Sequence, residues 1–220
     1  MTKQHEVTTI YIIRHGESES NVYAQENPDK PASQFGELGA SLTDKGRDQA
    51  TEVAEHLKDV AFTAVLSSDL NRARETGEIV AEHHNLPVLT YDRIRERYFG
   101  DDLSQVRKKE IEKALDDLNE EEKLAFRYLP HGESGYDVIN RFETFLQEII
   151  PQYRGKTIAI ISHGYVMRSF MIHAGYAKYD ELLSGTIDNA GYFVVESDGV
   201  HHEVVETRGI HKNEANDNEV

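Results

Sequence analysis

The sequence predicts an α/β fold: a three-layer sandwich in which helices cover both faces of a mainly parallel central sheet. Short apolar runs of strand length alternate along the chain with longer segments whose apolar residues recur at helical spacing. Such alternation is typical of parallel sheets. A segment at about 91–131 contains helical patterns but no strand pattern. We therefore expect a single domain over residues 1–220 with a helical cap inserted at 91–131.

The first half of the chain supplies three expected strands and two expected helices. The strands are Val7–Ile13, Ala64–Leu66 and a short extended piece at Pro87–Thr90. Thr43 can cap the first helix and Asp69 the second. Before the first helix, the segment 25–41 contains two prolines and two glycines, so we expect a surface loop there.

The second half completes the pattern. Ser134 begins a long amphipathic helix, which is followed by a buried strand and a further helix. An Asp-Gly turn then joins the last two strands, and the polar segment 211–220 is expected to be a flexible tail. The expected elements are the cap helices Leu103–Leu118 and Glu120–Tyr128 and the strands Lys156–Ile161, Gly191–Glu196 and His201–Glu206.

Composition excludes several classes of protein. The formal net charge of −16 disfavours binding to nucleic acid and to anionic membranes. The chain contains no cysteine, so disulfides and thiol chemistry are excluded. No apolar run approaches the roughly 20 residues that span a bilayer, and Met1–Glu6 is too polar for a signal-peptide core. We expect a cytoplasmic protein, and its oligomeric state is not predicted.

Two buried strands end in similar residues. One runs into Arg14-His15-Gly16 and the other into Ser162-His163-Gly164. In open α/β sheets, ligands bind beyond the carboxyl ends of the strands. A glycine after each histidine allows a sharp turn, and the helix that follows can direct its N-terminal amides at an anion. Both histidines are therefore candidates for one site.

A third strand end adds another cation. Ala64–Leu66 leads into a helix that has Arg72 in its first turn. Two histidines and two arginines, Arg14 and Arg72, at one sheet edge describe a pocket for a dianion, because guanidinium groups bind phosphate oxygens in bidentate fashion. No spacing of histidine and acidic residues resembles a zinc site, and no P-loop or dinucleotide glycine motif is present. We expect no metal and no cofactor.

These residues form an ordered set of motifs. The set begins with Arg14-His15-Gly16-Glu17-Ser18, with Asn21 three residues later. It continues through Leu42-Thr43-x-x-Gly46, Ser68-x-x-x-Arg72-Ala73, Arg95-Glu96-x-x-Phe99-Gly100, Gly132-Glu133-Ser134 and Ser162-His163-Gly164. In this order the motifs resemble the histidine phosphatase (phosphoglycerate mutase-like) superfamily.

The resemblance implies a role for each matching residue. His15 would attack phosphorus and become phosphohistidine, and Glu96 would protonate the leaving alkoxide and then activate water. The phosphoryl group would be bound by Arg14, Asn21, Arg72, His163 and Gly164. Many relatives continue the acid motif as Gly-x-Trp-Glu-Gly, whereas this chain has Gly100-Asp101-Asp102-Leu103. Asp101 and Asp102 are therefore alternative acids.

The resemblance implies an enzyme, and it favours a phosphomonoesterase over a mutase. Phosphoglycerate mutases typically have a Trp-Asn pair after the first motif and His-Gly-Asn-Ser in the last one. Here Ser20 precedes Asn21, and Tyr165 follows Gly164. The alternatives are a mutase-type phosphotransferase and a catalytically impaired phosphate-binding module. Arg93–Lys109 carries an excess of basic residues, so we expect a small phosphorylated substrate with a second anionic group if the cap overhangs the site.

Overall fold

Six strands form the central sheet in the computed structural model, which describes residues 7–31, 39–102, 104 and 106–213. The order across the sheet is β3-β2-β4-β1-β5-β6. The first four strands along the chain are parallel where they pair, and β5 and β6 add an antiparallel edge. The strands are β1 (Thr8–Arg14), β2 (Phe62–Ser68), β3 (Val88–Tyr91), β4 (Thr157–Ser162), β5 (Ile187–Ser197) and β6 (His202–Ile210).

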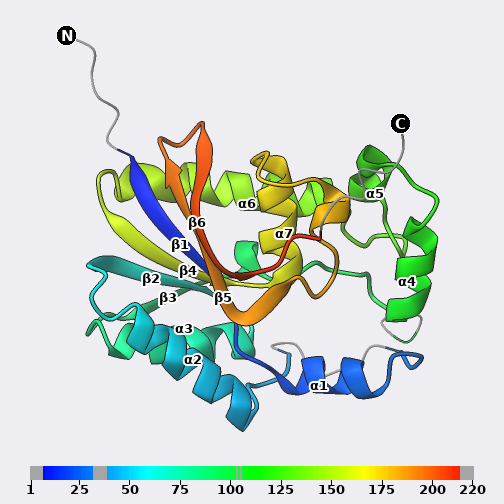
Figure 1. Cartoon of the computed structure of the whole chain (residues 1–220), viewed down its shortest axis with the longest axis horizontal. Coiled ribbons are helices and arrows are strands. Elements are labelled where there is room, and N and C mark those ends of the chain that lie inside the picture. The colour runs from blue at the N-terminus through cyan, green and yellow to red at the C-terminus, as the bar shows by residue number, and fades with distance from the viewer. Residues whose placement is uncertain (1–6, 32–38, 103, 105, 214–220) are drawn as a thin grey trace.

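Two pairs of helices cover the sheet, one on each side, as Figure 1 shows. Ile10 and Ile12 of β1 lie in one apolar cluster with α6 and α7, whereas Ile13 lies in a second cluster with α2 and α3. Successive side chains of a strand point to opposite faces, so an apolar run buries both sides at once. The three-layer α/β fold is confirmed. The covering helices are α2 (Asp44–His56), α3 (Asn71–Glu82), α6 (Gly135–Ile149) and α7 (Gly164–His173).

The segment expected to form a cap contains η1 (Asp92–Ile94), α4 (Lys108–Leu115) and α5 (Glu120–Ala125). Its described residues from 92 onward contain no strand, and Figure 1 places α4 and α5 beside the sheet rather than over its faces. Both helices are shorter than the sequence pattern predicted. Leu103 and Gln105, inside the first predicted helix, lie outside the described residues.

Two local predictions need correction. The segment 25–41 was predicted as a loop, but its first two residues end α1 (Glu19–Glu26), which Ser18 and Asn21 cap reciprocally; residues 32–38 lie outside the described residues. Asp69 does not cap α3, because Leu70 is its N-cap and makes no side-chain cap. Asp69 instead accepts two hydrogen bonds from the Arg95 guanidinium, both at 2.6 Å.

The start of the predicted tail is attached to the body of the protein. The backbone amide of His211 donates to the Thr186 carbonyl, and that of Asn213 donates to the Glu181 carbonyl. The remaining residues of the tail, 214–220, lie outside the described residues. Two short 3₁₀ turns complete the fold, η3 (Ile150–Gln152) and η4 (Tyr179–Glu181).

The loop after β1 packs directly on the first turn of α2. A Cβ built on Gly46 would overlap the Glu17 backbone, and one built on Gly16 would overlap Gly46. Ordinarily Gly→Ala in a helix gains up to about 1 kcal/mol. We expect Gly46→Ala instead to lower the free energy of unfolding by about 1–3 kcal/mol, as overpacking does. Urea unfolding should measure this loss, with Asp48→Ala on the exposed side of α2 as the control. A stabilised Gly46→Ala protein would contradict this packing.

Candidate active site

The contacts of His15 define its tautomer. Nδ1 lies 2.7 Å from the Gly16 carbonyl oxygen, which can only accept, so Nδ1 carries the proton. Nε2 accepts a hydrogen bond of 3.0 Å from Arg72 Nε, which can only donate. The imidazole is therefore neutral, and the lone pair of Nε2 faces Arg72.

Burial and charge hold His15 in this neutral form. The residue is 2% exposed. Burial, followed by the nearby cations Arg72 and Arg14, keeps the pKa of His15 well below its ordinary value, although the hydrogen bond to Gly16 opposes the shift. With a lowered pKa, His15 has its Nε2 unprotonated at neutral pH.

The second histidine lies beside the first. The rings of His15 and His163 have centroids 5.1 Å apart, because β1 and β4 pair in parallel with Arg14 opposite Ser162. His163 Nε2 lies 2.9 Å from Ser68 Oγ at the end of β2, and its buried Nδ1 has no hydrogen-bond partner among the described residues. Burial and then Arg72 hold the pKa of His163 well below its ordinary value, so it too is neutral before an anion binds.

Arg14 and Gly164 meet at the start of α7. A Cβ built on Gly164 would lie 3.4 Å from Arg14 Nε. That Nε is buried and unpaired among the described residues, while Nη1 donates to the Ile187 carbonyl. Burial lowers the pKa of Arg14 and nearby Glu96 raises it, but arginine remains charged in proteins. A buried cation with an unused donor is suited to bind an anion.

Glu96 lies in the same cavity as Arg14. This cavity, of about 220 Å³, is also lined by Arg97, Gly164 and Tyr165. The Glu96 carboxylate accepts from the backbone N–H of Arg97 at 2.8 Å and from that of Tyr165 at 3.3 Å. The carboxylate is thereby held near the start of α7.

The two alternative acids lie elsewhere. Asp101 and Asp102 are exposed, and neither lines this cavity. Asp101 accepts from the Tyr98 hydroxyl, and Asp102 accepts from the Ser104 hydroxyl. The geometry thus favours Glu96 as the carboxylate of the site.

The segment that carries Glu96 is anchored at three points. Ser162 Oγ donates to the Ile94 carbonyl at 3.0 Å, and Arg95 pairs with Asp69. Arg141, which forms an ion pair of 2.6 Å with Glu133, donates to the Glu96 carbonyl at 3.2 Å. These contacts connect the segment that carries Glu96 to the end of β4 at Ser162 and to Asp69, which follows β2.

Asn21 is connected to His15 but does not line the cavity. Its side-chain oxygen accepts from Ser18 and lies 3.4 Å from Asn189 Nδ2. Asn189 Nδ2 also donates to the His15 carbonyl at 3.1 Å, and the Ala190 amide does so at 3.3 Å. Asn189 and Ala190 were missed by the sequence reasoning. A positive φ at Ala190 (58°) is invisible in the sequence because alanine gives no signal for it.

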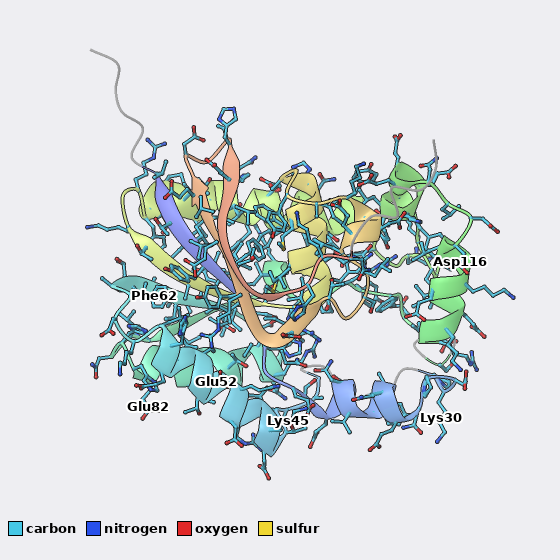
Figure 2. The ribbon with its side chains drawn as sticks, viewed as in Figure 1. Lys30, Lys45, Glu52, Phe62, Glu82 and Asp116 are labelled. Carbon is cyan, nitrogen blue, oxygen red and sulfur yellow. The ribbon has the colours of Figure 1, made fainter. Side chains whose placement is uncertain are left out.

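A second and larger cavity adjoins the first. It measures about 690 Å³ and shares Arg14, Gly185 and Ile187 with the smaller one. Figure 2 labels Lys45 and Glu52 of α2, which line it. Within the part of the chain that the structure describes, no group of three or more histidine and acidic residues could hold a metal ion. None of the described helices has the length and apolar character needed to cross a membrane.

Comparisons with known proteins identify the family of the chain. The profile of the histidine phosphatase superfamily (branch 1) matches residues 10–208. The chain therefore belongs to this superfamily, as its motifs indicated.

Individual relatives support the same assignment. Phosphoglycerate mutase-like protein 4 of Arabidopsis thaliana is 33% identical over 190 residues, which cover 81% of this chain and 77% of the relative. A probable phosphoglycerate mutase, GpmB, of Escherichia fergusonii is 30% identical over 164 residues, or 70% of this chain and 69% of the relative. The solved structure of YhfR from Bacillus stearothermophilus superposes with a TM-score of 0.71 at 29% identity and covers 92% of this chain and 97% of that one.

The neutral, buried histidines predict a pH dependence of stability. Their pKa values are lower in the folded protein than in the unfolded chain, whose histidines titrate near pH 6.5. The free energy of unfolding therefore contains the full contribution of the two neutral histidines above about pH 6.5. It decreases as the pH falls toward their pKa values in the folded protein. Each histidine should contribute a loss of up to roughly 1.4 kcal/mol per pH unit.

Urea unfolding between about pH 7.5 and pH 5.5 measures this slope. We expect His163→Gln to unfold with a shallower pH dependence than the wild type. His131→Asn is the control, since His131 is exposed and its positive φ (67°) is one that asparagine tolerates. Equal slopes for the wild type and His163→Gln would contradict the assignment of a low pKa to His163.

Proposed function

We propose that the protein is a phosphomonoester hydrolase that acts on a small anionic phosphorylated metabolite through a phosphohistidine intermediate. One observation carries the proposal: His15 Nε2 is unprotonated, buried and hydrogen-bonded to Arg72. A neutral imidazole can attack phosphorus only through a nitrogen that bears no proton, and in His15 that nitrogen, Nε2, faces the guanidinium of Arg72.

In the first step, Arg72 Nε exchanges its acceptor. It leaves the Nε2 lone pair of His15 and donates to a phosphoryl oxygen, so that the nucleophile is released as the substrate binds. Arg14 Nε and His163 Nδ1, both unpaired among the described residues, supply further donors to the phosphoryl oxygens. A bound dianion would also favour the protonated form of His163. No metal is required to neutralise the phosphoryl group.

Glu96 serves both steps. As an acid it donates its proton to the leaving oxygen, and as a base it activates the water that attacks phosphohistidine. Its place in the cavity beside Arg14 supports this role, whereas Asp101 and Asp102 lie outside that cavity. The leaving alcohol therefore occupies the 220 Å³ cavity, on the Glu96 side of the phosphoryl group.

Mutase-type phosphoryl return is the second candidate, because two relatives bear mutase names. The sequence differences favour hydrolysis. Ser20 Oγ lies 3.0 Å from Ser18 Oγ, and the Tyr165 ring packs against the Arg97 guanidinium 4.6 Å from its centroid. These residues stand where mutases typically have tryptophan and asparagine. The third candidate is a phosphate-binding module without catalysis. The hydrogen bond between Arg72 and the unprotonated Nε2 of His15 argues against this candidate.

Most of the basic residues of 93–109 whose side chains the structure describes lie away from the 220 Å³ cavity, so they do not support the expected second anion site there. Most are paired outside the cavity: Arg93 with Glu148, Arg95 with Asp69, Arg107 with Glu110 and Lys109 with Asp29. Of the basic residues in this segment whose side chains the structure describes, only Arg97 lines the 220 Å³ cavity. A preference for an anionic substrate must therefore come from other residues.

Product analysis distinguishes a hydrolase from a mutase. With phosphoglycerate as substrate, we expect inorganic phosphate and glycerate to accumulate, while little phosphate moves to the neighbouring hydroxyl. His15→Ala should abolish both reactions, because the nucleophile is lost. Phosphorus NMR of the reaction mixture measures all products at once. Rapid isomerisation without release of phosphate would identify a mutase instead.

The substitution Glu96→Gln tests whether Glu96 is the general acid. We expect single-turnover phosphorylation by an alkyl phosphate to slow by about 10²–10⁴-fold, the usual contribution of general acid catalysis. Phosphorylation by p-nitrophenyl phosphate should be nearly unchanged, because nitrophenolate leaves without a proton. Asp101→Asn is the matched control and should leave both rates intact. Equal slowing of both substrates by Glu96→Gln would argue against Glu96 as the acid, and a leaving-group-dependent loss in Asp101→Asn would transfer the role.

A further inference from the structure

Thr76 of α3 connects the loop after β1 to the first turn of its own helix. Its side chain is completely buried. The hydroxyl oxygen accepts a hydrogen bond of 3.1 Å from the Gly16 amide, and the hydroxyl donates one of 2.8 Å to the Arg72 carbonyl. These directions are fixed because an amide N–H only donates and a carbonyl oxygen only accepts. Thr76 therefore contacts the backbone on both sides of the contact between His15 and Arg72.

The two contacts of Thr76 close a ring of hydrogen bonds around His15. Arg72 Nε donates to Nε2 of His15, and Nδ1 of His15 donates to the Gly16 carbonyl. The Gly16 amide donates to Thr76, which in turn donates to the Arg72 carbonyl. Each of the four residues donates once and accepts once, so the ring runs in a single direction. The neutral tautomer of His15 with its proton on Nδ1 is the one that fits this ring.

The peptide group between His15 and Gly16 is held from both of its ends. Its N–H donates to Thr76 of α3. Its carbonyl oxygen accepts from the Asn189 side chain at 3.1 Å and from the Ala190 amide at 3.3 Å, both in β5. Rotation of the peptide plane would break contacts at both ends and leave buried backbone groups without partners. Thr76 supplies the partner on the N–H side.

Other threonines show that the bond within the helix is ordinary. Thr51 of α2 donates to the Arg47 carbonyl at 2.9 Å, and Thr144 of α6 donates to the Asn140 carbonyl at 2.7 Å. Each acceptor lies four residues earlier, as in Thr76, and such back-bonding is common in helices. Both of these threonines are exposed. Thr76 differs from them by its burial and by its second contact, which reaches the loop that carries His15.

We propose that Thr76 is a positioning residue for phosphoryl transfer, which keeps Nε2 of His15 directed at phosphorus while Arg72 changes its acceptor. The inference rests on the proposed function, because it takes His15 as the nucleophile. In that mechanism Arg72 Nε leaves Nε2, and one bond of the ring is lost. The other three bonds remain, and they connect the imidazole through Gly16 and Thr76 to the Arg72 main chain. The nucleophile therefore stays in place when its partner on the other side leaves.

Matched variants separate the hydroxyl of Thr76 from its volume. Thr76→Val keeps the shape and removes both hydrogen bonds, whereas Thr76→Ser keeps the hydroxyl. In single-turnover reactions with p-nitrophenyl phosphate, we expect phosphorylation of Thr76→Val to slow about 10- to 100-fold, as misplaced reacting groups do. The affinity for inorganic phosphate should stay close to that of the wild type, since the cations of the site are retained. Thr76→Ser and the control Thr51→Val should react at nearly the wild-type rate.

Proton NMR of the unreacted protein measures the positioning without turnover. The Nδ1 proton of His15, assigned by its loss in His15→Gln, should give a sharp signal in the wild type and in Thr76→Ser. In Thr76→Val the signal should broaden through exchange with water, because the Gly16 amide has lost its partner in α3. A slow Thr76→Val protein with an unchanged signal would overturn the proposal, since Thr76 would then act on the fold alone.

A second comparison guards against misfolding of Thr76→Val. Thr76→Cys has nearly the size of Thr76→Ser, but a thiol is a weak donor and a weak acceptor, so this variant should react slowly. A wild-type rate in Thr76→Val or Thr76→Cys, or equal slowing in Thr76→Ser, would overturn the proposal. Parallel losses of rate and phosphate affinity would overturn it too. Failure of the proposed hydrolase is a separate result, seen as the absence of His15-dependent phosphate release from the wild type.

Discussion

The neutral imidazole of His15 is the feature on which the rest of the site depends. Two contacts fix its protonation, because the Gly16 carbonyl can only accept and Arg72 Nε can only donate. The Gly16 contact is local to the loop after β1. The Arg72 contact requires β1 and β2 to end at the same edge of the sheet, on either side of β4, since Arg72 lies in the first turn of the helix after β2. The order of the parallel strands therefore places Arg72 against Nε2 of His15.

The cations around His15 make this arrangement suited to an anion. Arg14 and Arg72 help to lower the pKa of His15, which keeps its Nε2 unprotonated. Arg14 Nε and His163 Nδ1 remain buried and unpaired among the described residues, so the site is incomplete by itself. In the mechanism we propose, a phosphoryl group supplies these acceptors and the same substrate takes Arg72 away from Nε2. Binding and activation of the nucleophile are one event in that mechanism.

The sequence predicted the fold class and the grouping of His15, His163, Arg14 and Arg72, because strand ends of a parallel sheet share one edge. It could not reveal contacts that depend on tertiary geometry. Asp69 is a residue type that often caps helices, yet its carboxylate pairs with Arg95. The segment that contains Arg95 and Glu96 passes close to the end of β2, where Asp69 lies. The basic residues of 93–109 suggested an anion site by composition, but ion pairs elsewhere engage most of those described.

The stereochemical course at phosphorus tests the covalent role of His15 most directly. Each in-line displacement inverts phosphorus, so transfer to His15 followed by transfer to water gives overall retention. Hydrolysis of an isotopically chiral phosphorothioate ester, with the product configuration determined by phosphorus NMR, measures this outcome. Retention is the predicted result. Inversion would mean that water attacks the substrate directly, and it would contradict the account of His15 as the nucleophile.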